Sequence, residues 1–154
     1  MLDDFAFLAG RWRVQHRRLA LRLAGCTDWI EFAGTSRMQH ALAGQVNIDD
    51  NELALPTGPY RALTLRAFDP ISATWAIWWL DSRHPHHLDP PVVGRFEAGV
   101  GTFYGDDVLD GRPIRVRFLW HDITPTSCRW EQAFSADGGA TWETNWVMTF
   151  TRSE

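Results

Sequence analysis

The sequence predicts an all-β protein whose strands close into one antiparallel barrel. Apolar and polar residues alternate with a period of two from one turn signal to the next, which is typical of half-buried strands. Beyond the first residues, no segment of a dozen positions has apolar residues at helical spacing. The connections are of hairpin length, so neighbouring strands are expected to be antiparallel. About ten such strands would close on themselves to remove their edges, giving an up-and-down barrel.

The expected elements follow one another along the whole chain. Residues 3–8 favour one helical turn capped by an aspartate. About ten of the following strand candidates are expected to form: residues 11–23, 27–32, 36–42, 45–55, 60–68, 74–81, 92–97, 102–109, 113–123, 127–135 and 141–152. Turn signals separate them, among them Ala33-Gly34 and Asp110-Gly111.

Composition limits the class of protein. At 154 residues the chain has the size of one domain, so we expect a single barrel domain over residues 1–154. Hydrophobic residues make up 45% and charged residues 22%, which is typical of a folded globular protein and excludes a disordered one. The formal net charge of −4 disfavours nucleic acid as a partner. Nine Trp, nine Phe and two Tyr exceed what a core of this size needs, which favours rings that line a pocket.

The sequence also favours one cellular compartment. No stretch reaches the roughly 18 apolar residues of a membrane-spanning helix, so no membrane is expected as a partner. Asp3 and Asp4 stand where a signal peptide needs positive charge, and we therefore expect a cytoplasmic protein. In that reducing compartment Cys26 and Cys128 are expected to be free thiols.

Two strands indicate how side chains divide between the faces of the barrel. In residues 113–123, apolar side chains including Phe118 and Trp120 share one face. Residues 74–81 are apolar on both faces. Because neighbouring strand residues point in opposite directions, Trp78 and Trp79 cannot both face the interior. We expect one of them to be covered from outside by a loop, by the N-terminal segment or by the second subunit of a homodimer.

A short motif near the start has a counterpart near the other end of the chain. Gly10 and Trp12 form a Gly-x-Trp pattern on the first strand, and Arg152 lies on the last. The combination resembles the calycin superfamily, which comprises lipocalins, fatty-acid-binding proteins and nitrobindins. This resemblance implies that the Trp12 ring closes one end of the barrel with the Arg152 cation over its face, a structural role.

A broader likeness covers nearly the whole chain. It rests on residues 7–12 and 66–70, Trp75, Trp79, Asp81, and residues 94–96 and 134–146. These segments resemble an uncharacterised bacterial family of lipocalin-like barrels. Because that family has no established activity to transfer, the resemblance implies a fold and leaves the function open.

One segment matches a motif from a different fold. Residues 135–142 fit the Asp-box pattern Ser-x-Asp-x-Gly-x-Thr-Trp, which is repeated in sialidase propellers. Here the pattern occurs once, and the chain is too short for several propeller blades. A glycosidase also needs a pair of carboxylates that the motif does not provide. We therefore interpret Asp137 as the cap of a tight turn and Trp142 as the ring packed beneath it.

Residues 83–91 concentrate three of the six histidines, together with Asp89 and three prolines. Imidazole and carboxylate groups suit Zn or Fe, but their spacing matches no known metal motif. Because prolines stiffen the segment, we interpret it as a polar lid over one mouth of the barrel. His16, His40 and His121 lie on predicted strands, where a single His is more often hydrogen-bonded than a haem ligand. We expect no metal ion and no cofactor.

The candidate ligand-binding residues lie where a Trp-rich strand meets this loop. If one face of that strand is inward, Trp79 stands in the cavity and Asp81 at its rim. Arg95 and Phe96 begin the return strand, and hairpin pairing is expected to bring Arg95 close to Asp81, where it neutralises the carboxylate or binds an acidic ligand. Trp120 adds an aromatic wall. Other polar candidates for the interior are Arg66, Arg117, Glu131, Gln132 and Asn145.

These expectations favour a binding function. A barrel of about ten strands is wider than side chains easily fill, so we expect a cavity that binds a small, largely apolar molecule with an acidic or carbonyl end. One alternative is a cofactor-free enzyme in which an inward Asp, Glu or His transfers a proton. Another is a structural or interaction barrel without a ligand. The sequence has no nucleophile elbow, phosphate-binding loop or dinucleotide fingerprint.

Overall fold

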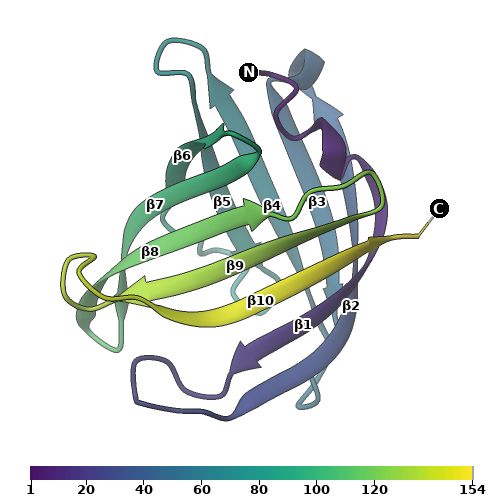
Figure 1. Ribbon diagram of the computed structural model, residues 1–154. Coiled ribbons are helices and arrows are strands. Elements are labelled where there is room, and N and C mark those ends of the chain that lie inside the picture. The colour runs from purple at the N-terminus through teal and green to yellow at the C-terminus, as the bar shows by residue number, and fades with distance from the viewer. Residues whose placement is uncertain (154) are drawn as a thin grey trace.

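The computed structural model describes residues 1–153, and it confirms the predicted barrel (Figure 1). Its elements are the 3-10 turns η1 (Ala6–Leu8) and η2 (Leu42–Gly44) and the strands β1 (Gly10–Leu19), β2 (Trp29–Ala41), β3 (Val46–Leu53), β4 (Tyr60–Asp69), β5 (Thr74–Asp81), β6 (Val92–Glu97), β7 (Val100–Leu109), β8 (Arg112–His121), β9 (Ser127–Ser135) and β10 (Glu143–Arg152). The strands follow chain order around the barrel, and β10 pairs with β1. This pairing joins the two strands that would otherwise form the edges of the sheet.

The long strand β2 corrects a predicted boundary. Ala33-Gly34 is expected to end a strand, but β2 continues through both residues. Gly34 is needed there because its surroundings leave no room for a side chain. A Cβ atom at this position would lie 2.4 Å from the Glu52 carbonyl oxygen and 2.8 Å from His16 Nε2. The glycine therefore permits a close approach inside the sheet instead of forming a turn.

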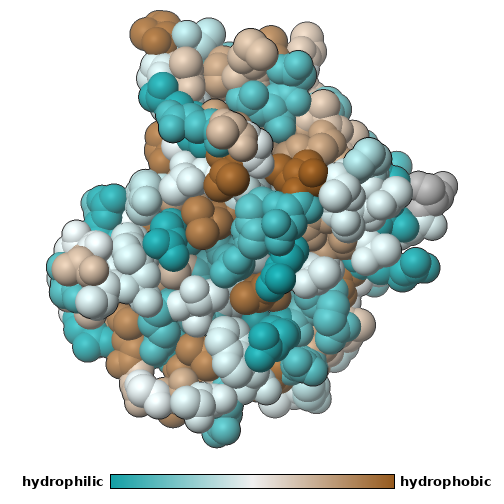
Figure 2. Space-filling view, viewed as in Figure 1, coloured by the Kyte–Doolittle hydropathy of each residue, from teal (hydrophilic) through white to brown (hydrophobic). Residues whose placement is uncertain are grey.

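Strand β1 shows how alternation divides the side chains between the interior of the barrel and its exterior. Trp12, Val14, His16 and Arg18 are buried, whereas the residues between them are exposed. In β5 the same alternation separates its neighbouring tryptophans, because Trp79 lines the interior and the side chain before it points outward. On the face shown in Figure 2, hydrophobic residues lie in small groups among hydrophilic ones. Within residues 1–153, no helix is long and apolar enough to span a membrane.

The N-terminal segment closes one end of the barrel (Figure 1). We call residues 5–8 of this segment the plug. Phe5 is fully buried, and its ring centroid lies 5.1 Å from that of Trp75, 5.0 Å from that of Phe96 and 6.1 Å from that of Trp120. All three pairs meet edge to face, which is a favourable geometry for aromatic rings. Aromatic packing therefore fills this end.

Arg152 fastens the plug to the barrel. Its guanidinium lies 4.2 Å from the centroid of the Trp12 ring, and it donates hydrogen bonds of 2.7 Å each to the carbonyl oxygens of Phe7 and Ala9. The Trp12 indole donates to the Leu8 carbonyl oxygen at 2.8 Å. The residues of the Gly-x-Trp motif and the late Arg thus lie together. Their contacts hold the entry of the chain against its last strand.

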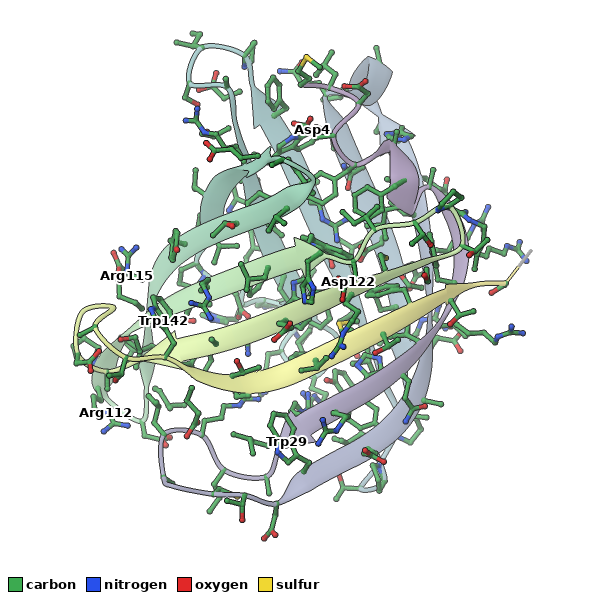
Figure 3. All side chains as sticks on the ribbon, viewed as in Figure 1. Asp4, Trp29, Arg112, Arg115, Asp122 and Trp142 are labelled. Carbon is green, nitrogen blue, oxygen red and sulfur yellow. The ribbon has the colours of Figure 1, made fainter. Side chains whose placement is uncertain are left out.

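The Asp-box segment forms the turn between β9 and β10. Asp137 accepts hydrogen bonds from the Thr141 backbone N–H at 2.8 Å and from the Ser135 hydroxyl at 2.7 Å. A hydrogen bond from the Thr141 hydroxyl has the largest effect on this carboxyl. Together these bonds lower the pKa of Asp137 to about 2. Trp142 lies on the outside of the barrel, where its ring lies 5.9 Å from that of Tyr104 and 4.7 Å from the guanidinium of Arg117 (Figure 3).

Replacing Trp12 with alanine is expected to lower the free energy of unfolding by about 3 to 5 kcal/mol, because removal of a fully buried ring leaves a cavity. Urea unfolding followed by circular dichroism measures this loss. The matched control is Trp29→Ala, which removes a partly exposed ring and should have a much smaller effect. An unchanged urea midpoint for Trp12→Ala would contradict the role of Trp12 in the core.

Candidate functional site

The interior of the barrel contains a cavity of about 360 Å³. Trp120 and Phe150 bound its deep end, next to the plug. Its mouth lies at the other end, where Arg18, Tyr60 and exposed residues of the loop between β5 and β6 contribute to the lining. The volume falls within the range of small-molecule sites in proteins.

Tryptophan rings form much of the cavity wall. Trp79 of β5, Trp130 of β9 and Trp146 of β10 come from strands that are far apart in the sequence but face the same space. The centroid of the Trp146 ring lies 5.7 Å from that of Trp79 and 5.3 Å from that of Trp130, with the rings nearly perpendicular in both pairs. Such a wall offers ring faces and edges to a flat or chain-like apolar molecule.

Arg18 places a positive charge at the inner side of the mouth. It is buried, and it donates a hydrogen bond of 2.8 Å to the Tyr60 hydroxyl. Its guanidinium also lies 4.9 Å from the ring centroid of Trp146 and 5.3 Å from that of Phe32. Among residues 1–153, Arg18 forms no ion pair with a carboxylate. Aromatic faces and one hydroxyl hold this cation, and its charge is not neutralised.

Two further arginines, Arg83 and Arg22, line the mouth. Arg83 pairs with Asp81 at 2.7 Å and lies 3.7 Å from the centroid of the Tyr60 ring. Burial opposes ionisation of Asp81, but the hydrogen bonds from Arg83 outweigh it and lower the pKa of this carboxyl. Arg22 is partly buried, and burial together with the charge of Arg18 lowers its pKa. Within the described residues 1–153, the inner mouth therefore combines one guanidinium that pairs with a carboxylate and two that form no such ion pair.

Asp89, in the loop between β5 and β6, has a raised pKa, in contrast to Asp81. Burial, and then the nearby charge of Asp107, raise the pKa of Asp89. The loop is anchored at this point, because the Asp89 backbone N–H donates to the Trp79 carbonyl oxygen at 3.0 Å. The loop contributes Arg83, His84 and Asp89 to the lining of the mouth. Among residues 1–153, no group of three or more His, Cys, Asp or Glu side chains is placed to hold a metal ion.

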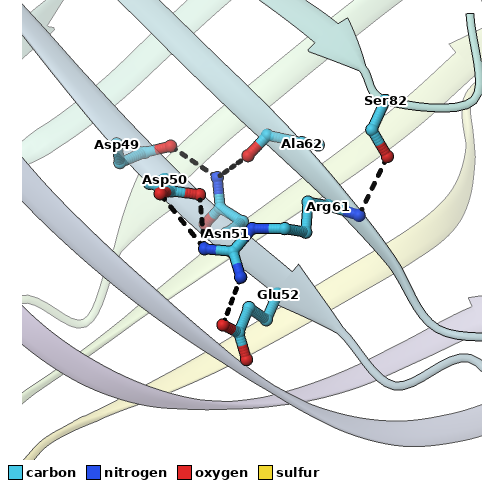
Figure 4. A network of polar contacts seen from close by, with 7 residues as sticks. All are labelled: Asp49, Asp50, Asn51, Glu52, Arg61, Ala62 and Ser82. Atoms are coloured by element: carbon cyan, nitrogen blue, oxygen red, sulfur yellow. Dashed lines mark hydrogen bonds and ion pairs between the residues drawn. The ribbon is translucent and has the colours of Figure 1, made fainter.

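A buried ion pair lies farther inside the barrel. Arg66 of β4 donates to Asp49 of β3 at 2.6 Å and to the Asn47 side-chain oxygen at 2.9 Å. Asn51 donates to the same Asp49 carboxylate at 2.6 Å (Figure 4). Because an isolated buried charge is very costly, this carboxylate is the counter-ion that allows Arg66 to stand in the interior. On the outer face of the same two strands, Arg61 pairs with Asp50 and Glu52 (Figure 4).

His16 links the wall to the charged mouth. The Trp146 indole donates to His16 Nδ1 at 3.0 Å, and the imidazole stacks on the Phe32 ring with centroids 4.6 Å apart. Burial first, and the charge of Arg18 second, lower the pKa of His16 from 6.5 to about 3. The imidazole is therefore neutral at pH 7, with Nδ1 as the acceptor and the proton on Nε2.

The predicted binding residues separate into two groups. Trp79, Asp81 and Trp120 line the cavity or its mouth. Phe96 points inward but packs at the closed end, where its ring centroid lies 5.0 Å from that of Phe5. It belongs to the packing around the plug and does not line the cavity.

The predicted pairing of Arg95 with Asp81 is wrong. Strands β5 and β6 pair over only three residues, with Trp75 opposite Gly94. Asp81 therefore lies at the start of the connecting loop, and Arg95 lies next to the far end of β5. Its side chain is exposed and donates to the Ser72 carbonyl oxygen at 3.5 Å. The physical reason is the register of the hairpin. Residues at equal distances from a hairpin loop pair with each other, and here the last pair before the long loop is Ile77 with Val92, so Asp81 has no partner on β6.

Arg18, Tyr60 and Asp49 are not among the residues that the sequence predicts to bind a ligand. The sequence does indicate that Arg18 points inward, because the alternation that begins with Trp12 places Arg18 on the same face of the strand. Strand β3 gives no such signal, since polar residues occupy both of its faces. The inward position of Asp49 follows from its pairing with Arg66, which only the folded strands reveal.

The buried His16 is expected to make folding less stable in acid. Between pH 6.5 and 3 the unfolded chain binds a proton that the folded protein does not, so the free energy of unfolding falls as the pH falls through this window. From pH 7 to pH 5 this contribution amounts to about 2 kcal/mol. Urea unfolding at both pH values measures the fall in the free energy of unfolding between pH 7 and pH 5. This fall should be smaller by that amount in His16→Gln, a variant that keeps an acceptor for the Trp146 indole. Equal drops in the two proteins would contradict a neutral, buried His16.

Comparison with known proteins supports the fold. No protein-family model matches the chain, and no curated protein matches it in sequence. The S-type phycobiliprotein lyase CPES from Guillardia theta is similar in structure, with 12% sequence identity, a TM-score of 0.63 and coverage of 99% of this chain and 92% of that chain. The structure of EF1p2_mFAP2b bound to DFHBI is also similar, with 13% identity, a TM-score of 0.50 and coverage of 99% of each chain. The chain therefore has a closed, ten-stranded antiparallel barrel, a fold that it shares with these two proteins.

Proposed function

We propose that this protein binds a small, largely apolar molecule with an acidic group. The apolar body lies in the cavity between the tryptophan rings, and the acidic group meets Arg18 at the mouth. The observation that carries this proposal is the buried guanidinium of Arg18, which forms no ion pair with a carboxylate among residues 1–153.

Electrostatics explains why an anion suits this position. A buried charge is unfavourable unless it is paired, and within residues 1–153 the contacts that stabilise Arg18 are ring faces and the Tyr60 hydroxyl. A guanidinium has five N–H donors, and two of them can bind one carboxylate side by side. A carboxylate entering through the mouth would neutralise Arg18 and would also approach the charge of Arg22.

The cavity walls explain the preference for an apolar body. Trp79, Trp130 and Trp146 present aromatic surface, while Ile77 and Val116 add aliphatic surface. Removing apolar ligand surface from water provides the main favourable free energy for such binding. A site with a few polar groups in an apolar wall uses the polar groups to orient the ligand.

A structural neighbour supports binding of this general kind. EF1p2_mFAP2b, whose barrel is similar to this one, was solved with DFHBI bound. The filled interior of a purely structural barrel would leave less space than the cavity of about 360 Å³ found here. These two observations favour a binding protein over a structural barrel.

The proposal is tested with dodecanoate as the probe and Trp fluorescence quenching as the measurement. The unaltered protein should show saturable quenching, and Arg18→Met should weaken the binding by about tenfold or more, because a charge-assisted hydrogen bond is lost. Methyl dodecanoate, which lacks the charge, should bind the unaltered protein about as weakly as dodecanoate binds the variant.

The matched control is Arg17→Met, on the same strand but on the opposite face. Arg17 is exposed and pairs with Glu31 at 3.2 Å, so its removal should leave the binding of dodecanoate unchanged. Equal effects of the two substitutions, or the absence of saturable quenching in the unaltered protein, would contradict the proposal.

A further inference from the structure

Two N–H groups at the deep end of the cavity are buried and have no hydrogen-bond partner among residues 1–153. They are Nε of Arg66 and Nε1 of Trp120. The two side chains are only 2% and 3% exposed, respectively, and both line the cavity. A buried donor without a partner is unfavourable, which makes two neighbouring examples in one cavity informative.

The two donors belong to one small region. The Arg66 guanidinium lies 5.5 Å from the centroid of the Trp120 ring and 4.9 Å from that of Phe5 in the plug. Its other nitrogens are occupied, Nη1 by Asn47 and Nη2 by Asp49. Nε is the one nitrogen of this guanidinium without an acceptor among residues 1–153.

Charge indicates which kind of acceptor fits. Asp49 already neutralises Arg66, at a distance of 2.6 Å. A second carboxylate at this end would therefore add an uncompensated negative charge close to Asp49. A neutral oxygen, such as a carbonyl oxygen, accepts hydrogen bonds without that penalty. Its two lone pairs match two N–H donors.

We infer that the deep end of the cavity is a second polar subsite, which binds a neutral carbonyl oxygen through Arg66 Nε and Trp120 Nε1. This inference rests on the proposed function and specifies its ligand: an apolar body with a carboxylate at the mouth and a carbonyl group at the far end. Tyr60, the partner of Arg18, and Arg66 are six residues apart on β4. That separation is about 20 Å between α-carbons, and the two side chains reduce the span that the ligand must bridge.

The inference is tested with two acids that differ only in the carbonyl group, dodecanoate and 11-oxododecanoate. Isothermal titration calorimetry measures both dissociation constants. The unaltered protein should bind the oxo acid about fivefold to tenfold more tightly, because the ketone oxygen gains partners inside the cavity. In Trp120→Phe, which keeps an aromatic ring and removes the N–H, this ratio should fall to within twofold.

The control variant is Trp142→Phe. It makes the same chemical change on the outside of the barrel, where the indole donates to the Gly139 carbonyl oxygen. This variant should keep the full preference for the oxo acid. Urea midpoints of both variants establish that they are folded under the conditions of the titration.

A spectroscopic measurement identifies the donor directly. The nine tryptophans give nine indole N–H signals in a proton–nitrogen NMR spectrum, and the signal missing in Trp120→Phe is that of Trp120. This signal should move downfield on addition of 11-oxododecanoate and should not do so with dodecanoate. Such a shift reports a new hydrogen bond, which a purely structural role of Trp120 would not produce.

The other outcomes are distinguishable. If both acids bind the unaltered protein with equal affinity, the carbonyl subsite is overturned and the binding function stands. If the preference for the oxo acid persists in Trp120→Phe, the carbonyl is bound elsewhere and the inference fails. If neither acid binds, the proposed function fails and the subsite with it.

Discussion

The packing of the plug into one end of the barrel determines where the cavity lies. Phe5 occupies the space between Trp75, Phe96 and Trp120, and Arg152 holds the backbone on either side of Leu8. A ten-stranded barrel is wide enough to leave space along its axis. With one end filled by rings, that space opens toward the loops at the other end. The molecule therefore has one end closed by aromatic rings and an open, charged mouth at the other.

The position of charged groups follows from this asymmetry. Because β1 begins at the sealed end with Trp12 facing inward, its alternation brings Arg18 to the inner side of the mouth. Arg66 stands nearer the plug, where its side chain is buried, and there a carboxylate and an amide oxygen accept from its guanidinium. The paired cation lies deep and the cation without a carboxylate lies at the mouth. This is the distribution expected if charge deep inside must be neutralised by the protein, while charge at the entrance can be neutralised by a ligand.

Much of the fold follows from the sequence, because strand alternation is a local property that adjacent residues determine. The strands and the opposite directions of Trp78 and Trp79 depend on that pattern, and the up-and-down order depends on connections of hairpin length. Gly34 could not be interpreted correctly, since the crowding that requires glycine comes from His16 and Glu52 on neighbouring strands. The site was predictable in part for a similar reason. Trp79 and Asp81 follow from alternation, but the position of Arg95 depends on the register of a hairpin with a long loop.

Native mass spectrometry of the protein, purified from the cells that make it, shows directly whether the cavity holds a ligand. We expect folded ions to carry a noncovalently bound molecule, and this molecule, released by denaturation, should be largely apolar and contain an acidic group. The same preparation of Arg18→Met should retain much less of it. If the folded ions of the unaltered protein have the mass of the bare chain, both as purified and after incubation with excess dodecanoate, the barrel is not a binding protein for an apolar acid.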